Sequence, residues 1–165
     1  MSIDTYTIVA AGVFGLCFGS FLNVLIYRLP RGKSVVWSRS TCTKCKAQIA
    51  WYDNVPVLSY LLLGGKCRRC DKRISALYPA VELASGVAAA LIVYKYGLTL
   101  KAVWVYAFIS IMLVITFIDW FHKIIPDVLS LGGVLLGWAG SFVCLDVRPL
   151  ESLVGSLIGG GIIIK

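Results

Sequence analysis

The run IVAAGVFGLCFGSFLNVLI, residues 8 to 26, contains no charged residue over 19 positions. A helix of this length rises about 28 Å, which is close to the hydrocarbon thickness of a bilayer. The whole chain is 59% hydrophobic and only 15% charged, whereas an average soluble domain has about 25% charged residues. The run therefore predicts a transmembrane helix, the first of several.

A secretory signal peptide is the alternative explanation for this run. The residues before it include Asp4 but no Lys or Arg, and no small-residue cleavage site follows it. The bases Arg28, Arg31 and Lys33 come after the run. Because positive charges mark the cytoplasmic side of a membrane helix, we expect an uncleaved anchor with its N-terminus outside and the following segment in the cytoplasm.

Further apolar runs define the predicted fold class. Twelve residues from Leu153 to Ile164 span only about 18 Å, too short for a hydrocarbon core of about 30 Å. We therefore predict an all-α polytopic membrane protein with about four complete transmembrane helices and a partial fifth, and we expect Lys165 to be an artificial or premature end. The complete runs after the first are Pro79–Val93, Ala102–Ile118 and Val128–Leu145.

Glycines in the fourth run predict close helix packing, with lipid-facing flexibility as the alternative. They are Gly132, Gly133, Gly137 and Gly140.

A basic insert separates the first two runs. Residues 28–73 hold 11 of the 16 Lys and Arg but only two acids. This charge bias predicts a cytoplasmic insert in contact with anionic lipid. We expect no nucleic-acid binding, since no groove-reading motif accompanies the bases. The predicted division is 1–27 for the first transmembrane helix, 28–78 for the insert and 79–165 for the remaining membrane bundle.

Four cysteines in the insert form two C-x-x-C pairs, separated by 21 residues. This spacing is close to that of four-thiolate zinc sites, and nearby Lys and Arg favour thiolates. Two disulfides are the alternative, but thiols stay reduced in the cytoplasm. We expect structural zinc, because four protein ligands leave no open coordination position. The predicted ligands are Cys42, Cys45, Cys67 and Cys70, whereas Cys17 and Cys144 are expected to be small buried hydrophobes.

Three acids lie near membrane boundaries. Asp119 closes the third run, where a helix C-terminus prefers cations, so it is either an interfacial acid or a functional group. Asp127 follows a proline and is expected to be the N-cap of the fourth helix. Glu82 lies near the start of the second run, where it either complements the helix dipole or contacts a ligand.

Five motifs in order resemble the type IV prepilin peptidases. They are GSFLNVLIYRLPRG, the pair CTKC and CRRC, VPVLSYLLLGGKC between them, YPAVELASG, and IDWFHKIIPDVLS. The resemblance runs from about Val13 to Ser130. It departs from the family at Asp53, where glutamate is common, and at Leu77, where a base is common.

The resemblance implies a membrane aspartyl endopeptidase that is also an N-methyltransferase. Such an enzyme cleaves type IV prepilins or pseudopilins after glycine on the cytoplasmic side of the bacterial inner membrane, and methylates the new N-terminus from S-adenosylmethionine. By resemblance, Asp119 is the first catalytic aspartate and the four insert cysteines bind zinc. The resemblance assigns no residue of this chain to the methyl donor.

Carboxylate-catalysed peptide hydrolysis requires a second acid beside Asp119, because one carboxyl must be protonated while the other activates water. The family places that acid in a G-x-G-D motif, which these 165 residues do not contain. We therefore expect the chain as printed to lack cleavage activity. The alternative function is a non-catalytic, membrane-anchored zinc module that binds prepilin or another partner. A third alternative is a small transporter or channel subunit with Glu82 and Asp119 lining a polar path, although such a protein does not need the insert.

Overall fold

The computed structural model describes residues 4–35, 40–124, 126–143 and 149–163. They form a helical protein with no strand in the described ranges, apart from two isolated bridges in the insert. The long helices are α1 (Thr5–Arg28), α3 (Leu77–Tyr96), α4 (Leu100–His122), α5 (Asp127–Val143) and α6 (Pro149–Ile163). The predicted all-α class, with a cysteine-bearing insert between the first two long helices, is confirmed.

Three of these helices, α1, α3 and α4, are long and apolar enough to cross a membrane. In the described chain, α5 and α6 are shorter apolar helices. The 17 residues of α5 span only about 26 Å, somewhat less than a complete crossing. The end of the predicted fourth run, residues 144–145, and the chain end at 164–165 lie outside the described residues.

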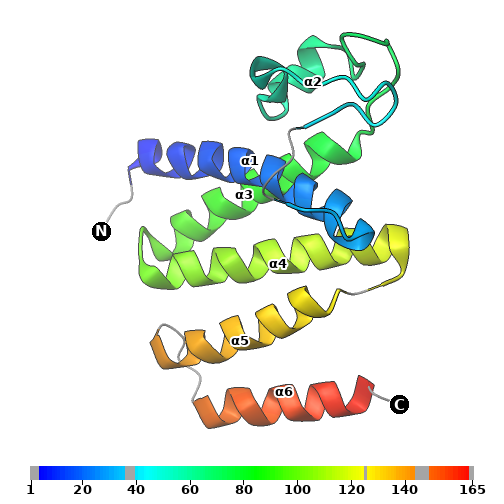
Figure 1. The fold of residues 1–165 in the computed structure, drawn as a ribbon. Helices are drawn as coiled ribbons and strands as arrows, with labels where there is room; N and C mark the ends of the chain where they lie inside the picture. Colours follow the sequence, from blue (N-terminus) through cyan, green and yellow to red (C-terminus); the bar gives the residue numbers. More distant parts are fainter. Residues whose placement is uncertain (1–3, 36–39, 125, 144–148, 164–165) are drawn as a thin grey trace.

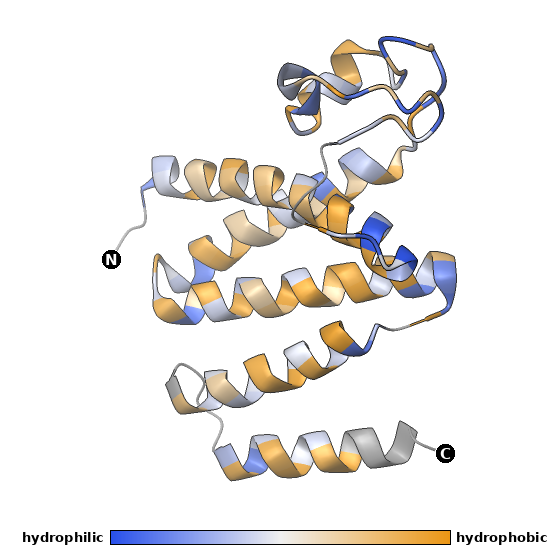
Figure 2. Cartoon of the chain, viewed as in Figure 1, coloured by the Kyte–Doolittle hydropathy of each residue, from blue (hydrophilic) through white to orange (hydrophobic). Residues whose placement is uncertain are grey.

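Helices α1 and α3 cross closely, and α4, α5 and α6 follow in a row beside them (Figure 1). Apolar residues run along all five helices, whereas the insert and the helix ends are more polar (Figure 2). A small buried core forms where α1, α3 and α4 meet; it contains Leu22, Ile26, Val81, Val114 and Ile118. Many large apolar side chains outside this core are exposed, as expected for helices whose outer surface faces lipid.

Glycines of α1 permit the close crossing with α3. A Cβ at Gly15 would lie 2.7 Å from the Ser85 carbonyl oxygen and 2.8 Å from Gly86 Cα. A Cβ at Gly19 would lie 2.7 Å from Glu82 Cα. Such distances are too short for any side chain, so only glycine lets the two backbones approach this far.

Two smaller expectations were wrong. The predicted close packing is not seen at three of the α5 glycines, because a Cβ at Gly132 or Gly137 would meet nothing within 4 Å and one at Gly133 would meet Ile111 at 3.8 Å, an ordinary contact. Cys17 is exposed rather than buried, since its side chain lies on the outer surface of α1. Cys144 lies outside the described residues.

The ends of α4 are well defined. Thr99 accepts a hydrogen bond from the Ala102 N–H at its start, with a distance of 3.2 Å. Lys123 ends it in the left-handed conformation, at a φ of 54°, and donates its N–H to the Asp119 carbonyl at 2.9 Å. This closure fixes the backbone of Asp119 in the last turn of the helix.

Candidate functional site

The two C-x-x-C pairs adopt the same turn, repeated 25 positions apart. In the first, Cys42 N–H donates to the Ala47 carbonyl at 2.8 Å. In the second, Cys67 N–H donates to the Lys72 carbonyl at 3.0 Å. The residue after each second cysteine, Lys46 or Asp71, has a positive φ of 61° or 52°. Each turn thus reverses sharply and aims both sulfurs of a pair to one side.

The four predicted metal ligands come together. Their sulfur atoms all lie within 4.8 Å of one another, and the Cys42 and Cys70 sulfurs are 4.0 Å apart. A tetrahedral zinc ion with Zn–S bonds of about 2.3 Å would separate sulfurs by about 3.8 Å. The cluster therefore fits a tetrathiolate metal site after small movements of the side chains, with zinc as the metal that this donor set favours.

The electrostatics of the cluster also favour a cation. The Cys45 backbone N–H, directed at the Cys42 sulfur, lowers the pKa of Cys42 to about 6 despite partial burial. The Lys72 backbone N–H acts to lower the pKa of Cys70, but burial and the neighbouring cysteine sulfurs raise that pKa to about 11. The negative charge of the first thiolate thus disfavours ionisation of the next cysteine. A bound divalent metal ion would remove this repulsion.

An ion pair joins the middle of the insert to the second cysteine turn. The guanidinium of Arg68 donates to both carboxylate oxygens of Asp53, at 2.7 and 2.9 Å. These hydrogen bonds hold the pKa of Asp53 below its usual range. Asp53 lies in the short 3-10 helix η2 (Trp51–Asn54), so the two-pronged contact fixes η2 against the turn that holds Cys67 and Cys70.

A buried carboxylate of α3 anchors the insert to the membrane helices. Glu82 is 8% exposed, and its Oε2 accepts the Val57 N–H at 2.8 Å. Val57 precedes the short helix α2 (Leu58–Leu62) and has a φ of 60°, which is strained for a β-branched residue. The contact therefore satisfies an N–H at a strained helix start and ties α2 to α3.

We expect Glu82→Ala to loosen this anchor and Glu82→Gln to preserve much of it. Alanine leaves the Val57 N–H without its acceptor, which costs about 1–3 kcal/mol, whereas glutamine retains an acceptor oxygen. Amide hydrogen exchange at residues 57–62 should accelerate about tenfold or more in Glu82→Ala. Equal exchange rates in wild type and both variants would show that the carboxylate does not hold α2.

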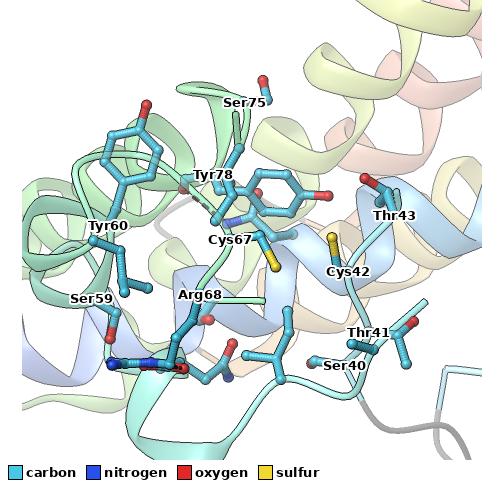
Figure 3. A pocket seen from close by; sticks show the side chains of 18 of the residues that line it. Ser40, Thr41, Cys42, Thr43, Ser59, Tyr60, Cys67, Arg68, Ser75 and Tyr78 are labelled. Carbon is cyan, nitrogen blue, oxygen red and sulfur yellow. Dashed lines mark hydrogen bonds and ion pairs between the residues drawn. The ribbon is translucent and has the colours of Figure 1, made fainter. Parts of the chain in front are cut away.

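A cavity of about 910 Å³ lies between the insert, the second half of α1 and the first turns of α3. Figure 3 shows Cys42 and Cys67 reaching it from different segments, beside the ring of Tyr78. Asn23 of α1 donates to the Tyr78 carbonyl at 2.9 Å and also lines the cavity. The volume of this cavity is in the range of small-molecule and headgroup sites.

Asp119 and Asp127 stand on either side of the connection between α4 and α5. Asp119 has an exposed side chain in the last turn of α4. Asp127 is the first residue of α5, and the Pro126 carbonyl accepts the first helical hydrogen bonds from Leu129 and Ser130. Asp127 is therefore one position inside the predicted N-cap, where its charge still favours the helix N-terminus.

Sequence reasoning missed three features of this region: the anchor at Val57, the Asp53–Arg68 pair and the close crossing at Gly15 and Gly19. Only the last had a local signal, because Gly15 and Gly19 form a G-x-x-x-G pattern inside the first apolar run.

These features define a class: a multi-pass helical membrane protein with a four-cysteine cluster of metal-site geometry between its first two long helices. Residues 13–96 match the family model of the bacterial peptidase A24 N-terminal domain. That match covers half of the chain, and the chain belongs to this family.

Curated relatives extend the similarity beyond that domain, and each is named a prepilin leader peptidase/N-methyltransferase. The Myxococcus xanthus protein is 39% identical over 89% of this chain and 44% of its own length. The Vibrio cholerae protein is 37% identical over 90% of this chain and 60% of its own length. The Klebsiella pneumoniae protein is 37% identical over 88% of this chain and 66% of its own length.

The chain thus spans about half to two thirds of these relatives. The resemblance to prepilin peptidases expected from the motifs is confirmed. No solved structure matches the chain.

Proposed function

We propose that this protein is a prepilin leader peptidase and N-methyltransferase of the bacterial inner membrane. The proposal rests on the several curated relatives with this name, whose similarity covers 85–96% of the chain. The substrates are prepilins or pseudopilins, cleaved after glycine on the cytoplasmic side. In this proposal the insert, residues 28–78, is cytoplasmic, the N-terminus is periplasmic, and residues 1–27 and 79–165 belong to the membrane bundle.

Asp119 is the proposed catalytic carboxylate of this chain. Its exposed side chain, at the end of an otherwise apolar membrane helix, is open to water and to a peptide at the membrane boundary. Paired with a second acid, one carboxylate accepts a proton from the attacking water while the other, protonated, polarises the scissile carbonyl. Asp119 alone supplies one half of this acid–base pair.

The insert holds the metal in this proposal, with Cys42, Cys45, Cys67 and Cys70 as zinc ligands. Four thiolates leave the ion no open position, so its role is to fix the fold of the insert rather than to activate water. S-adenosylmethionine, when bound, supplies the methyl group that is transferred to the new N-terminal amine. The chain's own contribution is a metal-fixed insert against the ends of α1 and α3.

The proposal is tested by Asp119→Asn in a full-length protein that joins this chain to the segment carrying the second acid, in inner-membrane vesicles supplied with a prepilin substrate. We expect cleavage to fall about 100-fold or more, since general acid–base groups typically contribute 10²–10⁴-fold. Methylation of a pre-cleaved pilin should persist, because asparagine leaves the zinc insert intact. Asp127→Asn is the matched control: it removes the same charge five residues beyond the end of α4 and should change cleavage only a few-fold.

Undiminished cleavage in Asp119→Asn would remove this residue from the catalytic pair. Vesicles with the unsubstituted full-length protein that bind prepilin but neither cleave nor methylate it would favour the non-catalytic zinc module instead.

A further inference from the structure

The cavity between the insert and the membrane helices is strongly basic. Eight Lys and Arg side chains line it, against two acids, Asp53 and Glu82. Asp53 is already paired with Arg68, and Glu82 accepts the Val57 N–H. In the described part of the chain, six of the bases have no carboxylate within ion-pair distance; they are Lys33, Lys44, Lys46, Arg69, Lys72 and Arg73.

The metal centre does not cancel this charge. A zinc tetrathiolate carries a net charge of −2, which is smaller than the excess of bases over acids in the lining. Arg28, another base of the lining, directs its guanidinium to the backbone carbonyls of Ser34 and Val35 at 3.1 and 3.2 Å. The cavity therefore favours an anionic ligand.

The cavity also lies at the end of two membrane-capable helices. Its walls include Ser20, Asn23 and Tyr27 from the second half of α1, and Tyr78 and Glu82 from the first turns of α3. Tyrosines are typical of the interface between hydrocarbon and water. An anionic group at this level is therefore within reach of a molecule that resides in the bilayer.

Apolar surface continues outward from these walls. Phe21, next to Ser20, is 45% exposed, and Leu83, next to Glu82, is 48% exposed. Both side chains belong to membrane-capable helices, so hydrocarbon chains can cover them. A basic cavity beside exposed apolar side chains matches a ligand with an anionic head and an acyl tail.

We propose that this cavity binds the headgroup of an anionic phospholipid. The lipid phosphate accepts hydrogen bonds from the lysine and arginine side chains of the insert, while the acyl chains lie along α1 and α3. Basic pockets of this kind, on the cytoplasmic side between membrane helices, suit lipid headgroups. The bound lipid would hold the insert against the membrane surface. The inference does not depend on the proposed protease or methyltransferase activity.

The methyl donor is the competing occupant, but the charges disfavour it. S-adenosylmethionine carries a sulfonium and an amino group against one carboxylate, so it is net cationic at neutral pH. A lining with an excess of bases repels such a molecule and attracts a phosphate diester.

The test measures phosphatidylglycerol and phosphatidylcholine binding to the detergent-solubilised, zinc-loaded chain by native mass spectrometry. We expect phosphatidylglycerol to bind about tenfold more tightly or better. Each neutralised base near the phosphate should weaken binding about fivefold, so Lys33→Gln, Lys72→Gln and Arg73→Gln together should weaken it about 100-fold. The control triple Lys66→Gln, Lys95→Gln and Lys101→Gln removes the same charge outside the lining and should change binding less than about threefold.

A second measurement locates the lipid without any variant. Phosphatidylglycerol with a photoactivatable headgroup should label peptides that contain residues 20–28 and 78–82, and label α5 and α6 weakly. Equal weakening by the two triple variants, equal binding of the two lipids, or displacement of phosphatidylglycerol by S-adenosylmethionine would each overturn the proposal.

Discussion

Cys67→Ser is expected to release the metal and unfold the insert while the membrane helices stay folded. Cys67 supplies one of four sulfurs that lie within 4.8 Å of one another, and a serine hydroxyl is a poor substitute for a thiolate toward zinc. Metal binding by such sites carries about 10–16 kcal/mol of apparent free energy at neutral pH. In the described residues 40–78, only Ser59 and Gly65 are buried, so little else can replace that contribution.

The measurement combines zinc content with limited proteolysis. Zinc should fall from about one ion per chain to a small fraction of that, and new cleavage sites should appear within residues 40–75. Cys42→Ser should show the same loss of zinc and the same new cleavage sites, because the two cysteine turns have the same backbone hydrogen bonds. Cys17→Ser is the control, since Cys17 lies outside the cluster. A full zinc equivalent in Cys67→Ser would show that this sulfur is not a ligand.

Gly15→Ala is expected to push α1 away from α3 and to destabilise the helix pair. The added methyl would lie 2.7 Å from Ala89 Cβ and from the Ser85 carbonyl oxygen. Overpacking costs typically 1–3 kcal/mol. We expect about 3 kcal/mol here, because the obstructing atoms include backbone of α3, which cannot rotate away as a flexible side chain can.

Gly12→Ala provides a matched control one helical turn away. Its Cβ would lie 3.7 Å from Ala90 Cβ and 3.8 Å from the Gly86 carbonyl oxygen, both ordinary contacts. Alanine is the better helix former by about 1 kcal/mol, so Gly12→Ala should be neutral or slightly stabilising. Thermal unfolding in detergent, followed by circular dichroism, should separate the two variants. Identical midpoints would contradict the close crossing.

The long helices could be predicted because each apolar run is bounded by charged or turn-forming residues. The expected run Ala102–Ile118, for example, lies wholly within α4 (Leu100–His122). The clustering of the four cysteines could be predicted for a similar reason: the spacing within each C-x-x-C is local, and the shared thiolate chemistry relates the two pairs. In both cases the signal is contained in a short stretch of sequence.

The remaining features depend on contacts between distant residues. Helix α2 begins at a strained Val57 that is held by Glu82, 25 positions further along the chain, and no local propensity predicts that start. The cavity likewise draws its walls from α1, the insert and α3, so its basic lining emerges only from the fold. At Gly15 and Gly19 the local G-x-x-x-G pattern is present, but the partner helix that it packs against lies about 65 residues further along the chain.

The repeated cysteine turns constrain the chain segment between them. A metal ion held by both turns ties together the ends of the 21 residues from 46 to 66. Closing this ring lowers the conformational entropy of the unfolded chain, which stabilises the folded insert by about 3 kcal/mol. That ring carries Asp53, Val57 and Ser59, whose contacts position η2 and α2. Metal availability would thus set how firmly one wall of the basic cavity is ordered, several residues away from the nearest sulfur.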